Sequence, residues 1–579
     1  MQPVAFKDKA GKALIKKLTV PRNPTKGNPD LRLHPWTAPL EFAQFYEYCK
    51  QDVRAEIAVS DAMPEMSPRE LRLWLMDQRI NARGLPIDLK AVNACIVIVE
   101  QAMGKYNAEI RALTHGAVES YSKAADMMRW LATRSCYVEN LDEEAVETEL
   151  AKQHPADVLR VLKLRALLSF GCVKKLYAMR AQTCADGRLR DQYSFHSAHT
   201  SLWNGRDIQV MNLYKGSNNT PEEIEAALAV IATGSLEYVE LVYGDALECV
   251  ANCLRSMICA PLGSTLISAD FTAIQAVVTS ALAGEKWRLD VFHTHGKIYE
   301  SMAAMLTGKS LDYYLQYRKE NGKHHPDRQT YGKIPVLASD FGAWVGGWVK
   351  FGAAAFGDEK AIKEMILRTR RQIPNIVEMW GGQTRNKFNK APDGSYAPER
   401  PELYGLEGAA IAAVQNPGTC FGHRQVRYMM VGDVLYCQPP GDGAPLQYHA
   451  PRLNKARREW ASPWELDLSY EGWNTKDGGS WLRMPLYGGV LTQNVVAKVA
   501  REFQADTLLA LDEHPSGNYP VVGHTHDEQI VETVHGTSEE YLRIARAAVL
   551  KPWAVDDEGR PWPIKLPGAE VTQRYGKWE

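Results

Sequence analysis

The sequence predicts an α+β fold, in which groups of helices surround an antiparallel sheet. Between residues 38 and 195, apolar side chains recur at spacings of three and four, which is typical of amphipathic helices. A buried strand is expected at 263–271, where an apolar run ends at Asp270. Two β-branched runs flank THDEQI at 525–530, and this pattern predicts a hairpin with Asp527 in its turn.

Length and composition limit the class of protein. The chain has 579 residues, too many for one hydrophobic core, and its 45% apolar and 24% charged residues are ordinary for globular proteins. With a net charge of -1, a surface for a polyanion must come from local clusters of Lys and Arg. The ten cysteines include no CxxC pair, and neither a signal peptide nor a long apolar run occurs. We expect a cytoplasmic protein with reduced thiols and no membrane contact.

The first third of the chain reads as an irregular arm followed by helices. Residues 1–35 are rich in Lys, Pro, Asn and Gly and have no clear period. Helices are expected from 38 onward, and those at 145–182 carry a basic face. Two interpretations of that face stay open, a solvated helix surface or a surface that follows a nucleic-acid backbone. Its members are Arg165, Lys174, Lys175 and Arg180.

The remainder alternates between helices and strands. A helix, TAIQAVVTSALAGE, follows the strand at 263–271, and more helix is expected to about 385. Residues 386–480 read as a hairpin around a Gly/Pro turn, with WELDLSYEGW as another strand, which indicates an insertion on a helical subdomain. A helix at 492–513 precedes the hairpin that contains THDEQI.

Asp270 and Asp527 are the strongest candidates for chemistry. Far apart in sequence, they can meet only if their strands are neighbours in one sheet. Two adjacent carboxylates repel each other unless one is protonated or a cation lies between them. Mg²⁺ prefers such hard oxygen ligands, and a pair of these ions stabilises the attacking and leaving oxygens of phosphoryl transfer. The alternative for a lone aspartate at the end of a strand is a helix cap.

The order of several motifs indicates a family. SADFTAI, RQTYGKIPVLASDFG and THDE occur in the order of motifs A, B and C of DNA polymerase I. DQRINARGLPID, DGRLR, a degraded HSAHTSLWNGRDIQVMNL, YGGVLTQNVVAKVAREF and the terminal RYGKW are further matches. The chain resembles a family A DNA polymerase of the bacteriophage type, and the matches extend over most of its length.

The resemblance implies a role for individual residues. Asp270 and Asp527 would hold two Mg²⁺ ions, which Mn²⁺ would replace, with the Phe271 carbonyl as a further ligand and Glu528 as an accessory. The incoming nucleotide would meet Lys333 and Arg328 through its triphosphate, Phe341 through its base and sugar, and Gln275 near its ribose. Residues implied to contact primer-template DNA are Arg206, Gln209, Asn212, Gln493 and His526.

Two departures from the family concern the nucleotide site. Gln275 stands where the family has a glutamate that crowds the 2′ position, so we expect weakened exclusion of ribonucleotides. Arg328 and Lys333 are five residues apart instead of four, and in a regular helix they would face different directions. Because Pro335 belongs in a first turn, the helix is expected to begin near Ile334, with Arg328 in the preceding loop.

Two further departures concern DNA. The family's T-G-R reads Thr200-Ser201-Leu202 here, so its arginine contact is lost or transferred to Arg206. Phage enzymes of this type carry a 3′→5′ exonuclease ahead of the polymerase, and Tyr48 and Asp52 fit its last motif, but no D-x-E pair precedes them. We therefore expect no exonuclease activity from this chain. The gene product is reduced, or the exonuclease is on another polypeptide, or the chain is cut.

The predicted architecture is a right hand. It divides into an exonuclease remnant (1–65), a palm-leading helix (66–89), a thumb (90–185), a palm in two parts (186–290 and 481–579) and fingers with a β-hairpin insertion (291–480). The expected function is extension of a primer with dNTPs in phage-type replication, by a monomer in the bacterial host. A separate exonuclease or processivity partner fits this picture. Alternatives are a single-subunit RNA polymerase-like or translesion-like enzyme, and a catalytically weak DNA-binding replication factor.

Overall fold

A computed structural model describes the chain over 9–25, 27, 29–63, 65–168, 171–214, 216, 220–381, 403–455, 466–474 and 479–576. The chain forms two compact units, Met1–Leu71 and Arg72–Glu579. In the first, α1 (Lys9–Thr19) packs on α2 (Pro39–Ala62), with Gly11 against the ring of Tyr48. α2 buries none of its residues, and it carries the Tyr48 and Asp52 of the predicted exonuclease motif. Most of α3 (Pro68–Arg83) belongs to the second unit.

A four-stranded antiparallel sheet carries both predicted aspartates. Its strand order is β12-β13-β5-β14, with β5 in the interior. β5 and β13 run antiparallel in continuous register from Thr265↔Thr533 to Asp270↔Glu528. The strand at 263–271 and the hairpin at 525–530 are thereby confirmed. The strands are β5 (Thr265–Asp270), β12 (Val521–Thr525), β13 (Glu528–Thr533) and β14 (Glu570–Thr572).

α21 (Gly488–Asp512) and α22 (Ser538–Ala548) pack against this sheet and against each other, and α12 (Ile274–Ala283) packs on α21. α21 begins earlier than the predicted 492, because Gly488 and Gly489 belong to it. A Cβ on Gly488 would come within 2.3 Å of the Trp380 carbonyl oxygen, so the glycine allows close packing instead of breaking the helix.

One group of helices has its own hydrophobic core around α4. Two small two-stranded sheets adjoin this group in the sequence. β1 precedes α4 and pairs with β2, which follows α8, and β3 pairs with β4. Helices α9–α11, which the sequence-based division assigns to the palm, also pack against α4. The helices are α4 (Leu89–Leu113), α5 (Ala124–Thr133), α6 (Glu143–Leu150), α7 (Ala156–Leu168), α8 (Lys174–Gln182), α9 (Pro221–Ile231), α10 (Leu236–Tyr243) and α11 (Ala246–Asn252). The strands are β1 (Leu85–Pro86), β2 (Arg188–Leu189), β3 (Tyr193–Ser194) and β4 (Asn204–Gly205), and the 3₁₀ turns are η1 (Gly171–Val173), η2 (Val210–Asn212) and η3 (Arg255–Met257).

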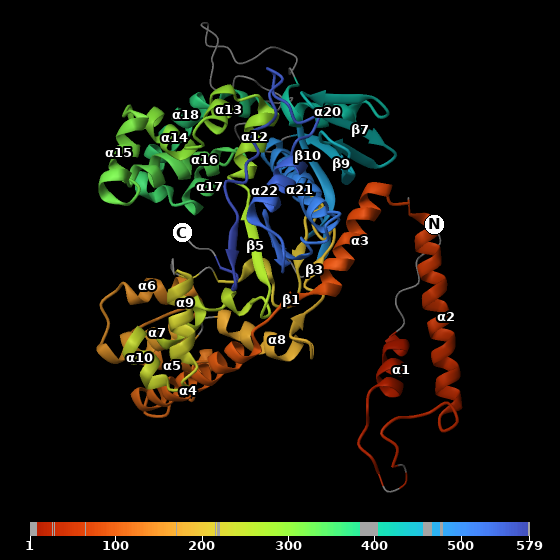
Figure 1. The fold of residues 1–579 in the computed structure, drawn as a ribbon, viewed down its shortest axis with the longest axis vertical. Coiled ribbons are helices and arrows are strands. Elements are labelled where there is room, and N and C mark those ends of the chain that lie inside the picture. The colour runs from red at the N-terminus through yellow and green to blue at the C-terminus, as the bar shows by residue number, and fades with distance from the viewer. Residues whose placement is uncertain are drawn as a thin grey trace. The chain divides into compact units, whose positions relative to one another are not determined.

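A second group of helices belongs to the larger core, which it shares with α12 and α21. Figure 1 shows α13–α18 and α4–α10 at opposite ends of β5. The elements are α13 (Lys286–His293), α14 (Ile298–Thr307), α15 (Leu311–Asn321), η4 (Arg328–Lys333), α16 (Ile334–Ser339), α17 (Val345–Lys350), η5 (Ala353–Phe356), α18 (Glu359–Gln372), α19 (Pro374–Trp380) and α20 (Gly405–Gln415).

The insertion at 386–480 contains more strands than predicted. Its described part forms a six-stranded antiparallel meander in the order β11-β10-β9-β8-β7-β6, which packs on α20. The Gly/Pro turn joins β8 to β9 as expected, but a second turn at Gly432, with φ 60°, divides the preceding run into β7 and β8. Residues 386–402 and 456–465 lie outside the described chain. The strands are β6 (Cys420–His423), β7 (Val426–Val431), β8 (Val434–Gln438), β9 (Leu446–Lys455), β10 (Leu466–Asn474) and β11 (Ser480–Pro485).

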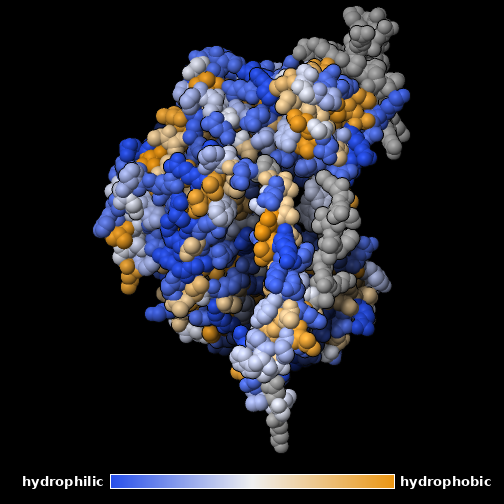
Figure 2. Space-filling model, turned by 90° about the vertical axis from the view of Figure 1, so that its right-hand side faces the viewer, coloured by the Kyte–Doolittle hydropathy of each residue, from blue (hydrophilic) through white to orange (hydrophobic). Residues whose placement is uncertain are grey.

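Hydrophilic residues cover most of the face drawn in Figure 2, and hydrophobic ones gather only in small groups. Among the described residues, none of the helices has the length and apolar character needed to cross a membrane. The nine described cysteines are all free thiols.

Candidate active site

The two predicted aspartates meet at one end of the four-stranded sheet. Asp270 is the last residue of β5, and Asp527 lies in the turn between β12 and β13. Glu528 stands opposite Asp270 in the ladder, and the Phe271 amide donates a hydrogen bond of 3.2 Å to the Asp527 carbonyl oxygen. Both aspartates are partly exposed. The strand register therefore brings two carboxylates and the backbone of Phe271 together where a solute can reach them.

The turn that carries Asp527 has only two residues between its paired ends. Thr525 and Glu528 face each other across the hairpin, which leaves His526 and Asp527 to make the connection. Such short turns require a positive φ at a central residue, and His526 has φ 52°. His526 is exposed, next to the aspartate that precedes β13.

Glu528 stabilises the turn through buried hydrogen bonds. Its buried carboxylate accepts hydrogen bonds from the Thr525 hydroxyl at 2.9 Å and the Tyr575 hydroxyl at 2.7 Å. Tyr575 comes from the terminal RYGKW segment, and burial raises the pKa of its phenol well above the usual range. In the sequence, this segment is recognisable only as a match to the family. The structure shows that it reaches the hairpin that carries Asp527.

An aromatic stack lies beneath the same hairpin. The buried His524 ring stacks on Tyr193 with 4.3 Å between ring centroids, and it meets Trp203 edge-on at 5.1 Å. Neither imidazole nitrogen has a hydrogen-bond partner among the described residues. Burial lowers the pKa of His524 to about 3, so the ring is a neutral aromatic spacer at physiological pH.

A buried aspartate connects two of the family motifs. Asp77, which begins DQRINARG, accepts hydrogen bonds from Trp203 Nε1 at 3.0 Å and Asn81 Nδ2 at 3.1 Å. Its burial raises the pKa of the carboxyl to about 6. Trp203 lies in the degraded T-G-R segment, and Lys498 of α21 reaches the same segment through the Ser201 hydroxyl at 3.0 Å. Sequence reasoning missed these contacts, because a buried polar pair between distant segments leaves no local period.

The structure corrects the prediction for motif B. Arg328 does not lie in a loop, since Arg328–Lys333 form one π-helical turn, η4, that leads directly into α16. The helix α16 itself begins at Ile334 with Pro335 in its first turn, as predicted. In the π turn, the Ile334 amide bonds to the Gln329 carbonyl, five residues earlier. Residues five apart therefore come closer to one full revolution in this turn than they would in a regular α-helix, which reduces the angle between Arg328 and Lys333.

The π turn packs tightly on α14. A Cβ on Gly332 would come within 2.3 Å of the Tyr299 carbonyl oxygen, so this position requires glycine. The Arg328 guanidinium lies 4.9 Å from the centroid of the Tyr299 ring, and its Nε donates to Glu300 at 2.9 Å. Lys333 is exposed and forms no ion pair with any described residue.

Phe341 lies in the turn that follows α16, and interactions among buried groups fix the backbone of this turn. Arg288 and Asp340 form a buried ion pair at 2.6 Å, and Trp380 Nε1 donates to the Asp340 carbonyl oxygen at 3.1 Å. The carbonyl of Phe341 lies against Gly489 of α21. The partly buried Phe341 ring therefore extends from a fixed backbone.

The remaining predicted residues lie at the surface. Gln275 is exposed in the first turn of α12, which begins after Ala273 with φ 47°. Arg206, Gln209 and Asn212 are exposed on one short segment, where the Asn212 amide donates to the Gln209 side chain at 3.3 Å. Gln493 is exposed in the second turn of α21. These positions permit contact with a ligand, and their individual roles stay predictions.

The basic face at 145–182 divides into inward and outward side chains. Arg165 turns inward and donates to the carbonyl oxygens of Tyr121 at 3.0 Å and Leu141 at 3.2 Å. Lys175 donates to the Asn212 carbonyl oxygen at 3.1 Å, next to the predicted DNA-gripping segment. At least Arg165 is therefore a structural residue.

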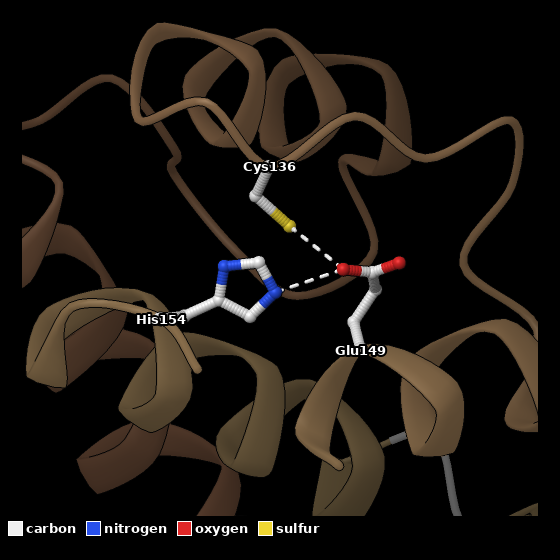
Figure 3. Close-up of side chains that lie close together, drawn as sticks. All are labelled: Cys136, Glu149 and His154. Carbon is white, nitrogen blue, oxygen red and sulfur yellow. Dashed lines mark hydrogen bonds and ion pairs between the residues drawn. The ribbon is translucent and has the colours of Figure 1, made fainter. Parts of the chain in front are cut away.

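A cluster of metal-ligating residue types occurs away from these motifs. Figure 3 shows Cys136 and His154 both directed toward one oxygen of Glu149. His154 Nε2 lies 2.8 Å from that oxygen, and the Lys152 ammonium lies 2.6 Å from the other. Burial raises the pKa of the Cys136 thiol. A protonated thiol and an adjacent ammonium group oppose a cation, so the cluster is best explained as a hydrogen-bonded connection between α6 and the chain segments that precede and follow it.

An acidic pair at the end of a central antiparallel sheet, together with basic residues on a helix, is typical of enzymes that transfer nucleotidyl groups. Two comparisons with known proteins agree, although no protein-family model matches the sequence. A DNA polymerase from Bacillus phage SP02 is 32% identical over 540 residues, which cover 92% of this chain and 76% of that protein. The polymerase domain of Pol1 from M. smegmatis, solved with DNA primer-template and dNTP, has the same fold, with a TM-score of 0.55 at 11% identity over 98% of this chain and 79% of that one.

The chain belongs to the family A DNA polymerases of the bacteriophage type. It is a DNA-directed DNA polymerase, and enzymes of this family use divalent metal ions.

Proposed function

We propose that this polymerase extends a DNA primer with dNTPs through two Mg²⁺ ions held by Asp270 and Asp527. One observation carries the assignment of the site, namely the register of β5 and β13, which places Asp270 beside the turn containing Asp527. The donors, two carboxylates and the Phe271 carbonyl, are the hard oxygen ligands that Mg²⁺ prefers. When bound, the ions stabilise the attacking 3′-oxygen and the departing pyrophosphate.

The triphosphate of the incoming nucleotide contacts motif B. Lys333 offers an exposed ammonium group that is paired with no carboxylate among the described residues, and Arg328 begins the π turn that Lys333 ends. Lys333 favours the negative charge that develops on the leaving pyrophosphate, and Arg328 binds the γ-phosphate of the incoming nucleotide. Phe341 packs against the nascent base pair, and Gln275 stands near the sugar of the nucleotide.

Primer-template DNA lies across the surface that carries the remaining candidates. His526 contacts the primer end, because it is adjacent to Asp527 in the exposed turn. Gln493, Arg206, Gln209 and Asn212 contact the duplex, where minor-groove acceptors common to all correct pairs report geometry instead of sequence. In this assignment, the palm comprises 186–290 and 481–579, the fingers 291–480 and the thumb 90–185.

A primer-extension assay tests the proposal. Wild-type protein, a labelled primer-template, Mg²⁺ and single dNTPs or rNTPs are combined, and Asp527→Ala is compared with Glu532→Gln. Glu532 lies in the same strand, β13, but it pairs with Arg188 at 2.8 Å. We expect Asp527→Ala to lose at least about a thousandfold in rate, since several kcal/mol of transition-state stabilisation are removed. Equal rates for both variants, or extension with rNTPs only, would contradict the assignment.

A further inference from the structure

We infer that Glu300 is a positioning residue that holds Arg328 in the orientation needed for the triphosphate of the incoming nucleotide. The inference rests on the proposed function and adds a residue to it. Glu300 lies in α14, outside every motif identified in the sequence, and only 4% of its surface is exposed. A carboxylate this deeply buried requires a partner, and its partner here is a residue of motif B.

The contact between the two side chains is specific. Arg328 Nε donates to Glu300 Oε1 at 2.9 Å, and the face of the guanidinium lies over the Tyr299 ring. His324 Nδ1 lies 3.3 Å from the same oxygen, so Oε1 of Glu300 is shared by two groups. One nitrogen and one face of the guanidinium are thereby fixed by adjacent residues of α14.

The terminal nitrogens of Arg328 remain available. Neither Nη1 nor Nη2 makes a hydrogen bond to a described residue, and the side chain keeps 26% of its exposure. These two nitrogens form the fork that binds phosphate oxygens in a bidentate manner. A carboxylate that sequestered the arginine would be expected to occupy this fork. Glu300 engages Nε instead and leaves the fork for a ligand.

The π turn explains why a positioning residue is needed. Residues in a regular helix have one strongly favoured geometry, whereas a single π turn exists because surrounding contacts maintain it. Gly332 and Arg328 attach the two ends of η4 to Tyr299 and Glu300 of α14. A long side chain that is ordered before binding loses less conformational entropy when the nucleotide arrives. Removal of Glu300 should therefore weaken nucleotide binding and leave the chemical step largely intact.

Steady-state extension of one nucleotide tests the inference with the full-length protein. The variants are Glu300→Ala, the isosteric Glu300→Gln, Arg328→Ala and the double variant. For Glu300→Ala we expect KM for dNTP to rise about tenfold, equivalent to one charge-assisted hydrogen bond, with kcat within about twofold. Glu300→Gln should show a smaller rise. In Arg328→Ala, the additional loss of Glu300 should change KM no further, because Glu300 acts through Arg328.

Glu285→Gln is the matched control. Glu285 is also buried, and its carboxylate accepts the Asn375 amide at 3.0 Å without contacting motif B. The Tm of this variant should fall about as much as that of Glu300→Gln, while its KM for dNTP should equal that of the wild type. An equal rise in KM in Glu285→Gln would assign the effect to general loosening and overturn the inference. So would an unchanged or lower KM in Glu300→Gln, or additive effects in the double variant.

Inorganic tripolyphosphate separates this inference from the proposed function. Its equilibrium binding to the protein in the presence of Mg²⁺ requires neither primer nor catalysis. Weaker binding to Glu300→Gln than to wild type supports the positioning role even if primer extension fails. Equal binding to both proteins contradicts the role even if primer extension succeeds.

Discussion

The two halves of the proposed active site depend differently on the spacing of residues in the sequence. On the sheet side, Asp270 and Asp527 meet because β5 and β13 pair in one continuous register. On the helical side, motif B contains one residue more between Arg328 and Lys333 than the family pattern, and a π turn absorbs it. The sheet tolerates one register, whereas the helix has an alternative hydrogen-bonding pattern that accommodates the extra residue.

The physical reason is the difference in periodicity. Successive strand residues point to opposite faces, so a shift by one residue moves every side chain to the wrong side. A helix can form bonds between residues three, four or five apart at moderate cost. Spacing in the sequence therefore predicts a site on strands more reliably than one on a helix.

Deletion of Ser268 should have the largest effect. Ser268 is buried in β5 opposite Ile530, two residues before Asp270. Its loss would either shift Asp270 out of register or reverse the faces of the residues that precede it. We expect extension activity below about a thousandth of wild type, the effect of losing one metal ligand. Retention of more than a tenth of the activity, with a wild-type circular dichroism spectrum, would show that the sheet tolerates a slip.

Replacement of Lys333 by alanine comes next in size. We expect kcat/KM for dNTP to fall about a hundredfold, since a charge-assisted contact to the triphosphate is worth up to about 3 kcal/mol. Lys360→Ala, at an exposed position in α18, serves as the control and should leave kcat/KM unchanged. Equal kinetics for both variants would remove Lys333 from the nucleotide site.

Deletion of Gln329 should have a much smaller effect than deletion of Ser268. Gln329 is exposed in the π turn, and its removal restores a spacing of four, at which an α-helix again aligns Arg328 with Lys333. We expect extension activity within about tenfold of wild type, because only the carbonyl that bonded Ile334 has to be replaced. Complete loss of activity in a folded protein would mean that the π turn itself, and not the alignment, is required.

The sequence was sufficient for the sheet side of the site. A strand that ends at an aspartate, and a short polar turn between two β-branched runs, are local patterns, and the structure has both where they were expected. The motif order then related them to a known family. On the helical side, the proline correctly indicated the start of α16, but no local pattern distinguishes a loop from a π turn ahead of it.

Other features depend on tertiary contacts that a sequence does not display. Gly488 and Gly489 suggest a break before a helix, yet they begin α21, because the Trp380 and Phe341 carbonyls pack where side chains would otherwise stand. The Tyr575 hydroxyl bond to Glu528 and the Trp203 bond to Asp77 join segments that are far apart in sequence. Burial and pairing of this kind become visible only after the chain has been folded.

Replacement of Gln275 by glutamate tests the sheet side of the site, because Gln275 lies in the first turn of α12, shortly after Asp270. A carboxylate at this position restores the charge that the family places near the sugar. We expect discrimination against ribonucleotides to increase by about tenfold, or about 1.4 kcal/mol, while Gln275→Ala decreases it. The measurement is the ratio of kcat/KM for matched dNTP and rNTP. An unchanged ratio in both variants would place Gln275 away from the ribose.

The last expected effect concerns the stability of the hairpin, and not catalysis, as a function of pH. His524 is neutral in the folded protein, where burial lowers its pKa to about 3, whereas an unfolded histidine has a pKa of about 6.5. Between these values the unfolded state binds more protons, so stability that is complete above pH 6.5 is lost as the pH falls. From pH 7 to 5 this histidine should cost about 2 kcal/mol of the free energy of unfolding.

His524→Phe removes that proton-binding site while retaining the stack on Tyr193 and the edge contact with Trp203. Because neither imidazole nitrogen is bonded to a described residue, we expect the free energy of unfolding at pH 7 to change by less than about 1.5 kcal/mol. Urea titrations at pH 7, 6 and 5 should show a shallower decline for the variant. If the free energy of unfolding of both proteins falls equally with pH, protonation of His524 in the unfolded chain does not limit the acid stability of the sheet. Another titratable group would then be responsible for the decline.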